Sequence, residues 1–266
     1  MAKRDETGDP ARRAGSAGPA PRAAAGGRAG PANHAQPKPS ARQTALEWVR
    51  SLVVAVVLFL LIRTFLVQTF TITSGSMIPT LLVGDWLMIS KVTYGPQIPF
   101  THARIPGYRH PRLNDIVVFR PPAEPDLDVV KRVVAVAGDT IEMRGGKFYR
   151  NGKFADGPYV IHTDPNDDQT HPWMVWQKRY VMKGVDPATY QPTRDNWGPL
   201  VVPPGNLFVM GDNRDDSLDS RYWGWLPIPD VEGNVMFIYY SYDTDSTRPL
   251  PFVTAIRWSR IGDIIR

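Results

Sequence analysis

The chain has 266 residues, of which 26 are Pro and none is Cys, and its 31 Lys and Arg against 26 Asp and Glu give a net charge of +5. This length predicts one or two domains, and 42% apolar residues suffice for a buried core. The lack of Cys excludes disulfides, thiolate nucleophiles, Cys-ligated zinc and iron–sulfur clusters.

The positive charge is confined to the start of the chain. Residues 1–50 contain nine Lys and Arg against four Asp and Glu, so the remaining 216 residues are neutral. A nucleic-acid-binding domain more often carries its basic surface on the folded body, so we expect no nucleic-acid partner. Within residues 1–42, 24 are Ala, Gly or Pro and none is Leu, Ile, Val or Phe. We therefore predict a disordered basic tail over residues 1–45.

An apolar segment follows this tail. The uninterrupted apolar run Leu52–Ile62 is short for a membrane span, but residues 46–67 reach the required length with Arg50 and Arg63 near the ends of the run. Long Arg side chains can extend to the membrane interface, so we predict a transmembrane anchor over residues 46–67. A cleaved signal peptide is disfavoured because no small-residue cleavage site follows, and a buried core helix is disfavoured because the run is apolar on all sides.

The basic residues also predict the orientation of the anchor. Several bases precede the apolar run, whereas after Arg63 none appears before Lys91. The positive-inside rule places the N-terminus in the cytoplasm and the following 200 residues on the other side.

The rest of the chain is predicted to be mainly β. Short runs of β-branched and aromatic residues indicate strands, and Gly145-Gly146 and Asn151-Gly152 are typical of hairpin turns. The stretch 155–205 is rich in Pro, Asp and Trp and has little periodicity, which indicates a loop-rich insertion. The predicted strands are 115–119, 129–136, 147–150, 206–210 and 234–240.

A candidate nucleophile follows the anchor. Ser76 lies between Gly75 and Met77 in a turn-like segment that can present its hydroxyl, although composition alone favours an ordinary linker. A nucleophilic Ser needs a base. None of the five His residues lies on an apolar strand, so a Ser-His-Asp triad stays open but no His is favoured.

Lys131 is the more informative candidate base. It lies with Arg132 in a run whose two strand faces are both apolar, so both cations risk burial. Burial lowers the pKa of a Lys side chain, and a neutral amine can act as a general base. The alternative is an edge strand from which Lys131 reaches solvent.

Residues 211–224 contain four Asp, two Arg and two Ser. A calcium loop is disfavoured, because Arg214 falls on a ligand position and Ser217 replaces the turn glycine, and we expect no metal. A solvated acidic loop is the default interpretation. The sharper hypothesis is a buried polar network, in which Asp residues neutralise Arg residues and Ser217 hydrogen-bonds the Lys131 amine.

Four segments, in this order and behind an anchor, resemble bacterial signal peptidase I (leader peptidase), the membrane serine protease that removes signal peptides from exported proteins. The resemblance covers roughly residues 46–266. The matching segments are Ser74–Leu81, Gly84–Gly95, Asp115–Asp139 and Gly211–Gly224.

The resemblance implies a role for each matched residue. Ser76 would be the nucleophile and Lys131 the general base, with the Ser76 backbone N–H and the Ser74 hydroxyl holding the oxyanion. Ser217 would orient the amine. The structural ion-pair network would consist of Asp212, Asp219, Arg132 and Arg221. The shallow pockets for small residues at −1 and −3 of the signal peptide would be lined by Phe70, Ile72, Met77, Val118 and Val130.

We expect antiparallel sheets in a catalytic core of residues 68–137 and 207–266, with an inserted cap over residues 138–206. The implied partners are preprotein signal peptides, membrane lipid and the protein export machinery, and no cofactor is expected. Trp86, Trp223 and Trp258 are candidates for contact with lipid, or they fill the core. Two alternatives remain: a self-cleaving relative, which would lack the anchor, and a non-catalytic anchored β-domain that binds secretion partners.

Two residues depart from the family pattern. Thr73 stands at a position often taken by Pro or an acidic residue, which is expected to change little. Asp216 stands where many relatives carry Asn, and its extra carboxylate beside Ser217 would favour a protonated Lys131.

Overall fold

The computed structural model describes residues 41–99, 101, 103–122, 124, 127–164, 168 and 170–265. Two compact units are present, Met1–Trp48 and Val49–Arg266. Residues 1–40 of the predicted tail lie outside the described residues, and residues 41–45 are helical.

The apolar segment forms helix α1, Ala41–Phe65. In the described part of the chain it is the one helix long and apolar enough to cross a membrane, and none of its residues is buried. At 1.5 Å per residue its 25 residues reach about 37 Å, which exceeds a hydrocarbon core of about 30 Å. The helix begins five residues before the predicted anchor and ends at Phe65, and Val67 already belongs to a strand.

The larger sheet of the second unit has seven antiparallel strands, and the runs of β-branched and aromatic residues predict such strands. Its strands lie in the order β1-β2-β11-β3-β4-β9-β10. Four predicted strands fall in it, two of them (β4 and β9) with the predicted bounds. The strands are β1 Val67–Thr71, β2 Asp85–Ser90, β3 Ile116–Phe119, β4 Val129–Val136, β9 Asn206–Met210, β10 Leu226–Pro227 and β11 Val231–Ser241.

A second antiparallel sheet has the order β7-β6-β5-β8 and lies within residues 140–201, inside the predicted insertion. Positive φ angles at Gly145 and Gly146 form the turn between β5 and β6, where a side chain would strain the backbone. Asn151 and Gly152 do the same between β6 and β7. The strands are β5 Thr140–Arg144, β6 Lys147–Arg150, β7 Lys153–Phe154 and β8 Trp197–Val201.

Short helices connect the strands. The segment between β1 and β2 contains η1, and the loop after β9 contains α2. The short helices are η1 Gly75–Met77, η2 Pro172–Arg179, α2 Ser220–Trp223, η3 Ile228–Asp230, α3 Pro251–Thr254 and η4 Trp258–Arg260.

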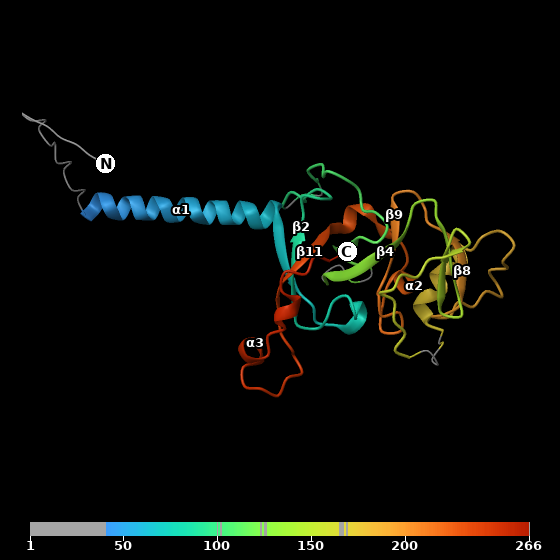
Figure 1. Cartoon of the computed structure of the whole chain (residues 1–266). Helices are drawn as coiled ribbons and strands as arrows, with labels where there is room; N and C mark the ends of the chain where they lie inside the picture. The colour runs from blue at the N-terminus through green and yellow to red at the C-terminus, as the bar shows by residue number, and fades with distance from the viewer. Residues whose placement is uncertain are drawn as a thin grey trace, which may run out of the picture. The chain divides into compact units, whose positions relative to one another are not determined.

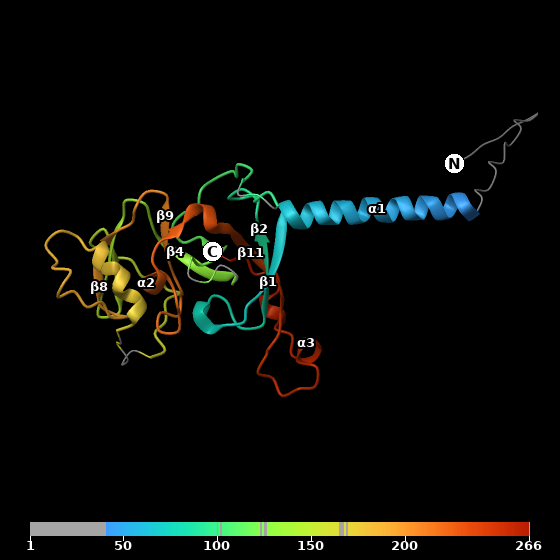
Figure 2. The ribbon, with the colours of Figure 1, turned by 180° about the vertical axis from the view of Figure 1, so that it is seen from behind.

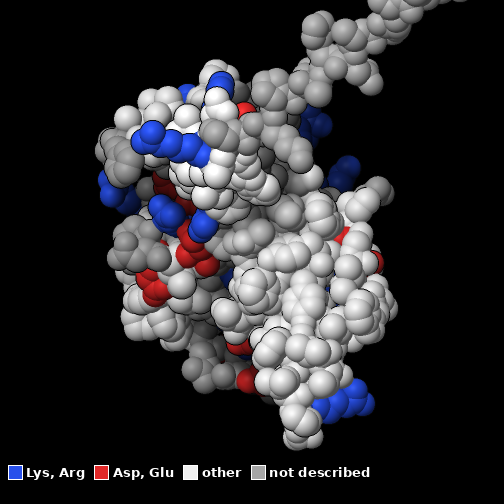
Figure 3. Space-filling view, turned by 90° about the vertical axis from the view of Figure 1, so that its left-hand side faces the viewer, with Lys and Arg blue, Asp and Glu red and all other residues white. Residues whose placement is uncertain are grey.

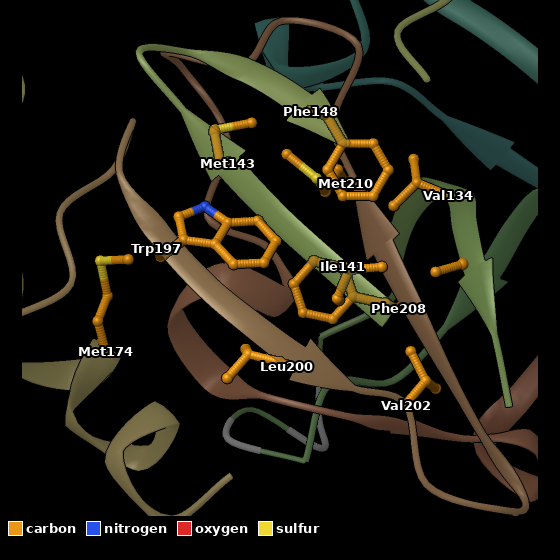
Figure 4. Packing of buried hydrophobic residues seen from close by; sticks show 11 residues of the cluster. Val134, Ile141, Met143, Phe148, Met174, Trp197, Leu200, Val202, Phe208 and Met210 are labelled. Carbon is orange, nitrogen blue, oxygen red and sulfur yellow. The ribbon is translucent and has the colours of Figure 1, made fainter. Parts of the chain in front are cut away.

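The two sheets share a hydrophobic core. Views from opposite sides show β8 at the far end of the sheets from β2, with β4 and β9 between them (Figures 1 and 2). Val134 and Phe208 from β4 and β9 pack with Ile141 and Leu200 from β5 and β8 (Figure 4). Because the predicted insertion packs on the main sheet, residues 49–266 form one compact unit.

The three Trp residues singled out from the sequence differ in exposure. Trp258 is 73% exposed and Trp86 is 37% exposed. Trp223 instead packs on the core, with its ring centroid 5.6 Å from that of Phe119.

Candidate active site

Ser76 lies in η1, in the connection from β1 to β2, and is 7% exposed. Ser74 precedes this turn, and its hydroxyl makes no capping hydrogen bond to the helix backbone. The Ser76 carbonyl oxygen accepts a hydrogen bond from the Asn213 backbone N–H at 3.1 Å. The turn that carries Ser76 is therefore fastened to the loop that follows β9.

Lys131 lies on β4, where its backbone is paired with Val117 of β3. Its side chain is buried, with the residue only 4% exposed. The Lys131 Nζ and Ser76 Oγ atoms are 2.5 Å apart, and the Ser74 hydroxyl oxygen lies 3.4 Å from that of Ser76. Three polar side chains from two separate chain segments thus converge on one point.

Burial lowers the pKa of Lys131 to about 8 from its usual 10.5. The carboxylates of Asp219, Asp216 and Asp212 oppose this by favouring the charged form, while Arg221 adds to the lowering. The expected effect of Asp216 on the protonation of Lys131 therefore has the predicted sign. Desolvation outweighs all of these charges, because the amine has lost almost all contact with water.

Arg132 and Asp212 form a buried ion pair behind the site, and each side chain is 1% exposed. Two parallel hydrogen bonds of 2.8 Å join the guanidinium to the carboxylate. Thr80 donates a further hydrogen bond to Asp212 at 2.5 Å, and the Tyr159 ring centroid lies 3.6 Å from the Arg132 guanidinium carbon. Arg132 is thus buried in the charged form, with its partners in place.

Arg221 and Asp219 form a second buried pair, also with two hydrogen bonds, each of 2.9 Å. Asp219 also accepts hydrogen bonds from the Gly211 backbone N–H at 3.1 Å and from the Ser217 hydroxyl at 2.7 Å. Both predicted ion pairs are therefore present, in the combination Arg132–Asp212 and Arg221–Asp219.

Ser217 lies next to the backbone of Ser76, with Gly211 between them. A Cβ atom on Gly211 would lie 2.4 Å from Ser217 Oγ and 2.5 Å from the Ser76 carbonyl oxygen, so only glycine fits. The Ser217 hydroxyl donates a hydrogen bond to the Asp219 carboxylate. The Lys131 amine makes its described hydrogen bond with the Ser76 hydroxyl. The hydrogen bond from Ser217 to Lys131 remains a prediction.

The five residues predicted to line the substrate pockets come together in one apolar cluster. Ile72, Met77 and Val118 are buried members of it, and Phe70 and Val130 pack against it partly exposed. A separate cleft of about 210 Å³ opens at Ser74, Ser76 and Lys131. Its remaining lining includes none of the five and consists of Pro121, Glu124, Leu127, Val129, Trp173, Asp216, Leu218 and Trp223.

Sequence reasoning missed several residues that support the site. Arg214 is 1% exposed and pairs at 2.6 Å with Asp156, which belongs to the predicted insertion. Asn213 and Thr80 contact the Ser76 carbonyl and Asp212, respectively. Nothing in the spacing of these residues indicated their partners. Among the described residues, no group of three or more His, Asp and Glu side chains is arranged to hold a metal ion.

Comparison with known proteins identifies the family of the chain. The sequence profile of the family described as "Signal peptidase, peptidase S26" matches residues 45–240. The chain belongs to this family.

Individual relatives cover most of the chain. Signal peptidase I of Pseudomonas aeruginosa is 31% identical over 234 residues, which are 82% of this chain and 79% of that protein. Signal peptidase I of Aquifex aeolicus is 31% identical over 230 residues, 74% of this chain and 84% of that protein. A crystal structure of a signal peptidase I from Enterococcus faecalis is 31% identical and covers 47% of this chain and 97% of its own, with a TM-score of 0.30.

Proposed function

We propose that the chain is a membrane-bound serine endopeptidase that removes N-terminal signal peptides from exported preproteins through an acyl-Ser76 intermediate. The observation that carries this proposal is the 2.5 Å separation between Lys131 Nζ and Ser76 Oγ in a member of the signal peptidase family. A hydroxyl nucleophile needs a base within hydrogen-bonding reach of its proton, and Lys131 is within that reach.

The dyad performs both halves of the reaction. Neutral Lys131 accepts the hydroxyl proton of Ser76 as Oγ bonds to the carbonyl carbon of the substrate. The intermediate collapses, the peptide C–N bond breaks, and the Lys131 ammonium gives its proton to the leaving amine. Lys131 then accepts a proton from a water molecule that attacks the acyl carbon. That proton returns to Ser76 Oγ as the signal peptide leaves with a new carboxyl group.

The burial of Lys131 supports its role as base. With a pKa of about 8, roughly one amine in ten is neutral at pH 7, compared with roughly one in three thousand at the usual pKa of 10.5. A Ser-Lys dyad needs this neutral form, because a protonated amine cannot accept the hydroxyl proton.

The oxyanion is held by the Ser76 backbone N–H and the Ser74 hydroxyl. Support comes from the position of Ser74, whose hydroxyl is 3.4 Å from the nucleophilic oxygen and is not used to cap η1. Donors fixed before the reaction stabilise the developing charge without reorganising.

Ser217 and the two ion pairs are positioning residues. The Arg221–Asp219 pair holds Ser217 and Gly211, and Gly211 touches the Ser76 carbonyl. The amine of Lys131 is thereby kept against Ser76 without a carboxylate bonded to it directly, which would hold it in the charged form.

Substrate specificity comes from the apolar cluster beneath the dyad. The signal peptide binds extended, as an added strand, with its small −1 and −3 side chains directed at the cluster of Phe70, Ile72, Met77, Val118 and Val130. Because three of these are buried already, little room remains for large side chains.

The chain is placed in the cytoplasmic membrane by a single span, with its N-terminus in the cytoplasm and the catalytic part outside. The core is made of residues 68–137 and 207–266 and the cap of residues 138–206. Lipid and the export machinery are its partners. Ten residues, 66–75, separate Phe65 at the end of α1 from Ser76. This short connection keeps the nucleophile near the bilayer. Extended, this connection spans at most about 40 Å.

The test is preprotein cleavage by the full chain and by the Ser76→Ala and Lys131→Ala variants. Each is expected to lose turnover by about 10³-fold or more, since the two residues act as a unit. Lys147→Ala, at an exposed Lys on β6, is the matched control and keeps full activity. Turnover like that of the original chain in either dyad variant would exclude the mechanism. Absence of turnover by the original chain would instead favour a non-catalytic anchored β-domain.

A further inference from the structure

A second pocket of about 470 Å³ lies beside the end of α1. Its wall includes Thr64 in the last turn of α1, Gln68 on β1 and Lys91 directly after β2. The Lys91 backbone N–H donates to the Leu66 carbonyl at 3.0 Å, which fixes Lys91 next to the end of the helix. We call it the helix-end pocket. The residues lining it and the cleft at Ser76 have no member in common.

The charged lining of the helix-end pocket is mostly cationic. Lys91, Arg104 and Arg120 line it, against the single carboxylate of Glu232. Arg120 pairs with Glu232 at 3.0 Å, and also with Asp128 outside the lining at 3.0 Å. The pocket therefore has an excess of positive charge that its own carboxylate does not neutralise.

Two of the cations remain available to a ligand. Arg104 uses Nη1 to donate to the carbonyl oxygens of Val231 at 2.7 Å and Gly95 at 3.2 Å, which fixes the guanidinium and leaves its other nitrogens without a described acceptor. The Lys91 ammonium has no hydrogen bond or ion pair within the described part of the chain. Burial lowers the pKa of Lys91, with Glu232 opposing this from a distance. A half-buried charge without a contact partner is a costly arrangement that a bound anion relieves.

Nearby charged groups lower the net positive charge around the pocket from two to one. Arg63, in the last turn of α1, adds a cation that acts on Lys91. Asp230 acts on Arg104 and Asp128 on Lys91, so the pocket and its surroundings together hold four cations and three carboxylates. This excess suits a ligand with one negative charge. The surface view shows basic and acidic side chains mainly on the left of the face in view, with others at its right edge and bottom, around a broad uncharged area (Figure 3).

The depth of the pocket decides what kind of anion it takes. If α1 spans the membrane, its last turn lies at the boundary between hydrocarbon and headgroups, where the lipid phosphodiesters are. Ile98 and Pro99 add apolar surface to the lining, next to the polar Gln97 and Thr101. A pocket lined by cations and by apolar residues, at this depth, matches a phospholipid rather than a soluble phosphate.

We propose that the helix-end pocket binds the phosphodiester headgroup of an anionic phospholipid, with Lys91 and Arg104 as its ligands. This proposal rests on the membrane anchoring in the proposed function. The bound lipid fixes the catalytic part against the membrane surface at one defined point beyond the span.

The experiment uses the full chain in lipid nanodiscs made of phosphatidylcholine alone or with added phosphatidylglycerol, followed by transfer to detergent and native mass spectrometry of the retained lipid. The original chain is expected to retain phosphatidylglycerol in preference to phosphatidylcholine. Lys91→Gln is expected to lower that retention about tenfold, as for loss of a charge-assisted hydrogen bond. Lys91→Arg keeps it, and Lys147→Gln, an exposed Lys on β6, is the matched control.

Equal retention by Lys91→Gln and the original chain would overturn the proposal. Displacement of the lipid by millimolar inorganic phosphate would also overturn it, by showing a site for soluble anions. Cleavage of a preprotein is measured on the same samples. Because Lys91→Gln leaves the dyad intact, this variant is expected to cleave the preprotein even where it has lost the lipid, so the lipid site and the proposed function are tested separately. Failure of the original chain to enter nanodiscs would instead refute the anchor, and the lipid site with it.

Discussion

Replacing Lys131 by Met is expected to stabilise the fold while abolishing cleavage. Lys131 is 4% exposed, and burial lowers its pKa from 10.5 to about 8. This difference in pKa between the unfolded and folded states means that the charged amine destabilises the folded state by about 3 kcal/mol at pH 7. Met has a similar length and no charge, but it loses the hydrogen bond to Ser76, worth about 1 kcal/mol. The net gain in the free energy of unfolding is about 2 kcal/mol at pH 7.

The pH dependence identifies the cause of this gain. Between about pH 8 and 10.5, the unfolded chain still holds a proton on Lys131 that the folded chain has released. The original chain therefore becomes more stable relative to Lys131→Met as the pH rises through this window, and the advantage of the variant disappears. Below pH 8 the amine is charged in both states and the advantage is constant.

The assay is thermal unfolding of the full chain in one detergent, from pH 6 to pH 10.5, with the variants compared at each pH so that other titrations cancel. Ser76→Ala, which keeps the buried amine, is the control and follows the pH dependence of the original chain. A difference between Lys131→Met and the original chain that does not change with pH would refute the reasoning, because it would show that the folded state does not disfavour the charged amine.

Four further predictions concern the site. The value of kcat/KM for preprotein cleavage rises tenfold per pH unit below about pH 8 and levels off above it, and a flat profile from pH 6 to 9 would contradict Lys131 as the base. Asp216→Asn removes a charge that raises the pKa of Lys131, so the midpoint of this profile moves to lower pH, whereas Asp216→Glu leaves it in place. Ser74→Ala lowers kcat by about 10²- to 10³-fold with KM little changed, as steady-state kinetics can show, and a change in KM alone would argue against an oxyanion donor. Asp212→Asn leaves the buried Arg132 charge without its carboxylate and destabilises the fold by about 3–5 kcal/mol, measured by unfolding, whereas an unchanged midpoint would mean that the guanidinium is compensated elsewhere.

Local sequence pattern predicted five of the eleven strands in the described part of the chain. The runs at 129–136 and 206–210 have the bounds predicted from β-branched and apolar residues, because a strand buried on both faces needs such residues at every position. Strands β1 and β2 were not predicted. β1 follows α1 after a single residue, so its apolar positions merge with those of the helix.

The sequence by itself determined the mainly β fold, the apolar span and the residue types available for chemistry, since each depends on local composition and periodicity. It also indicated Ser76 and Lys131, through their contexts and through the ordered resemblance. Only the tertiary structure decided that these two side chains, 55 positions apart, meet at 2.5 Å. The pairing of Arg214 with Asp156 and the direction of the Ser217 hydrogen bond were likewise decided there. Distances and desolvation depend on how the strands pack, and a linear pattern does not contain that information.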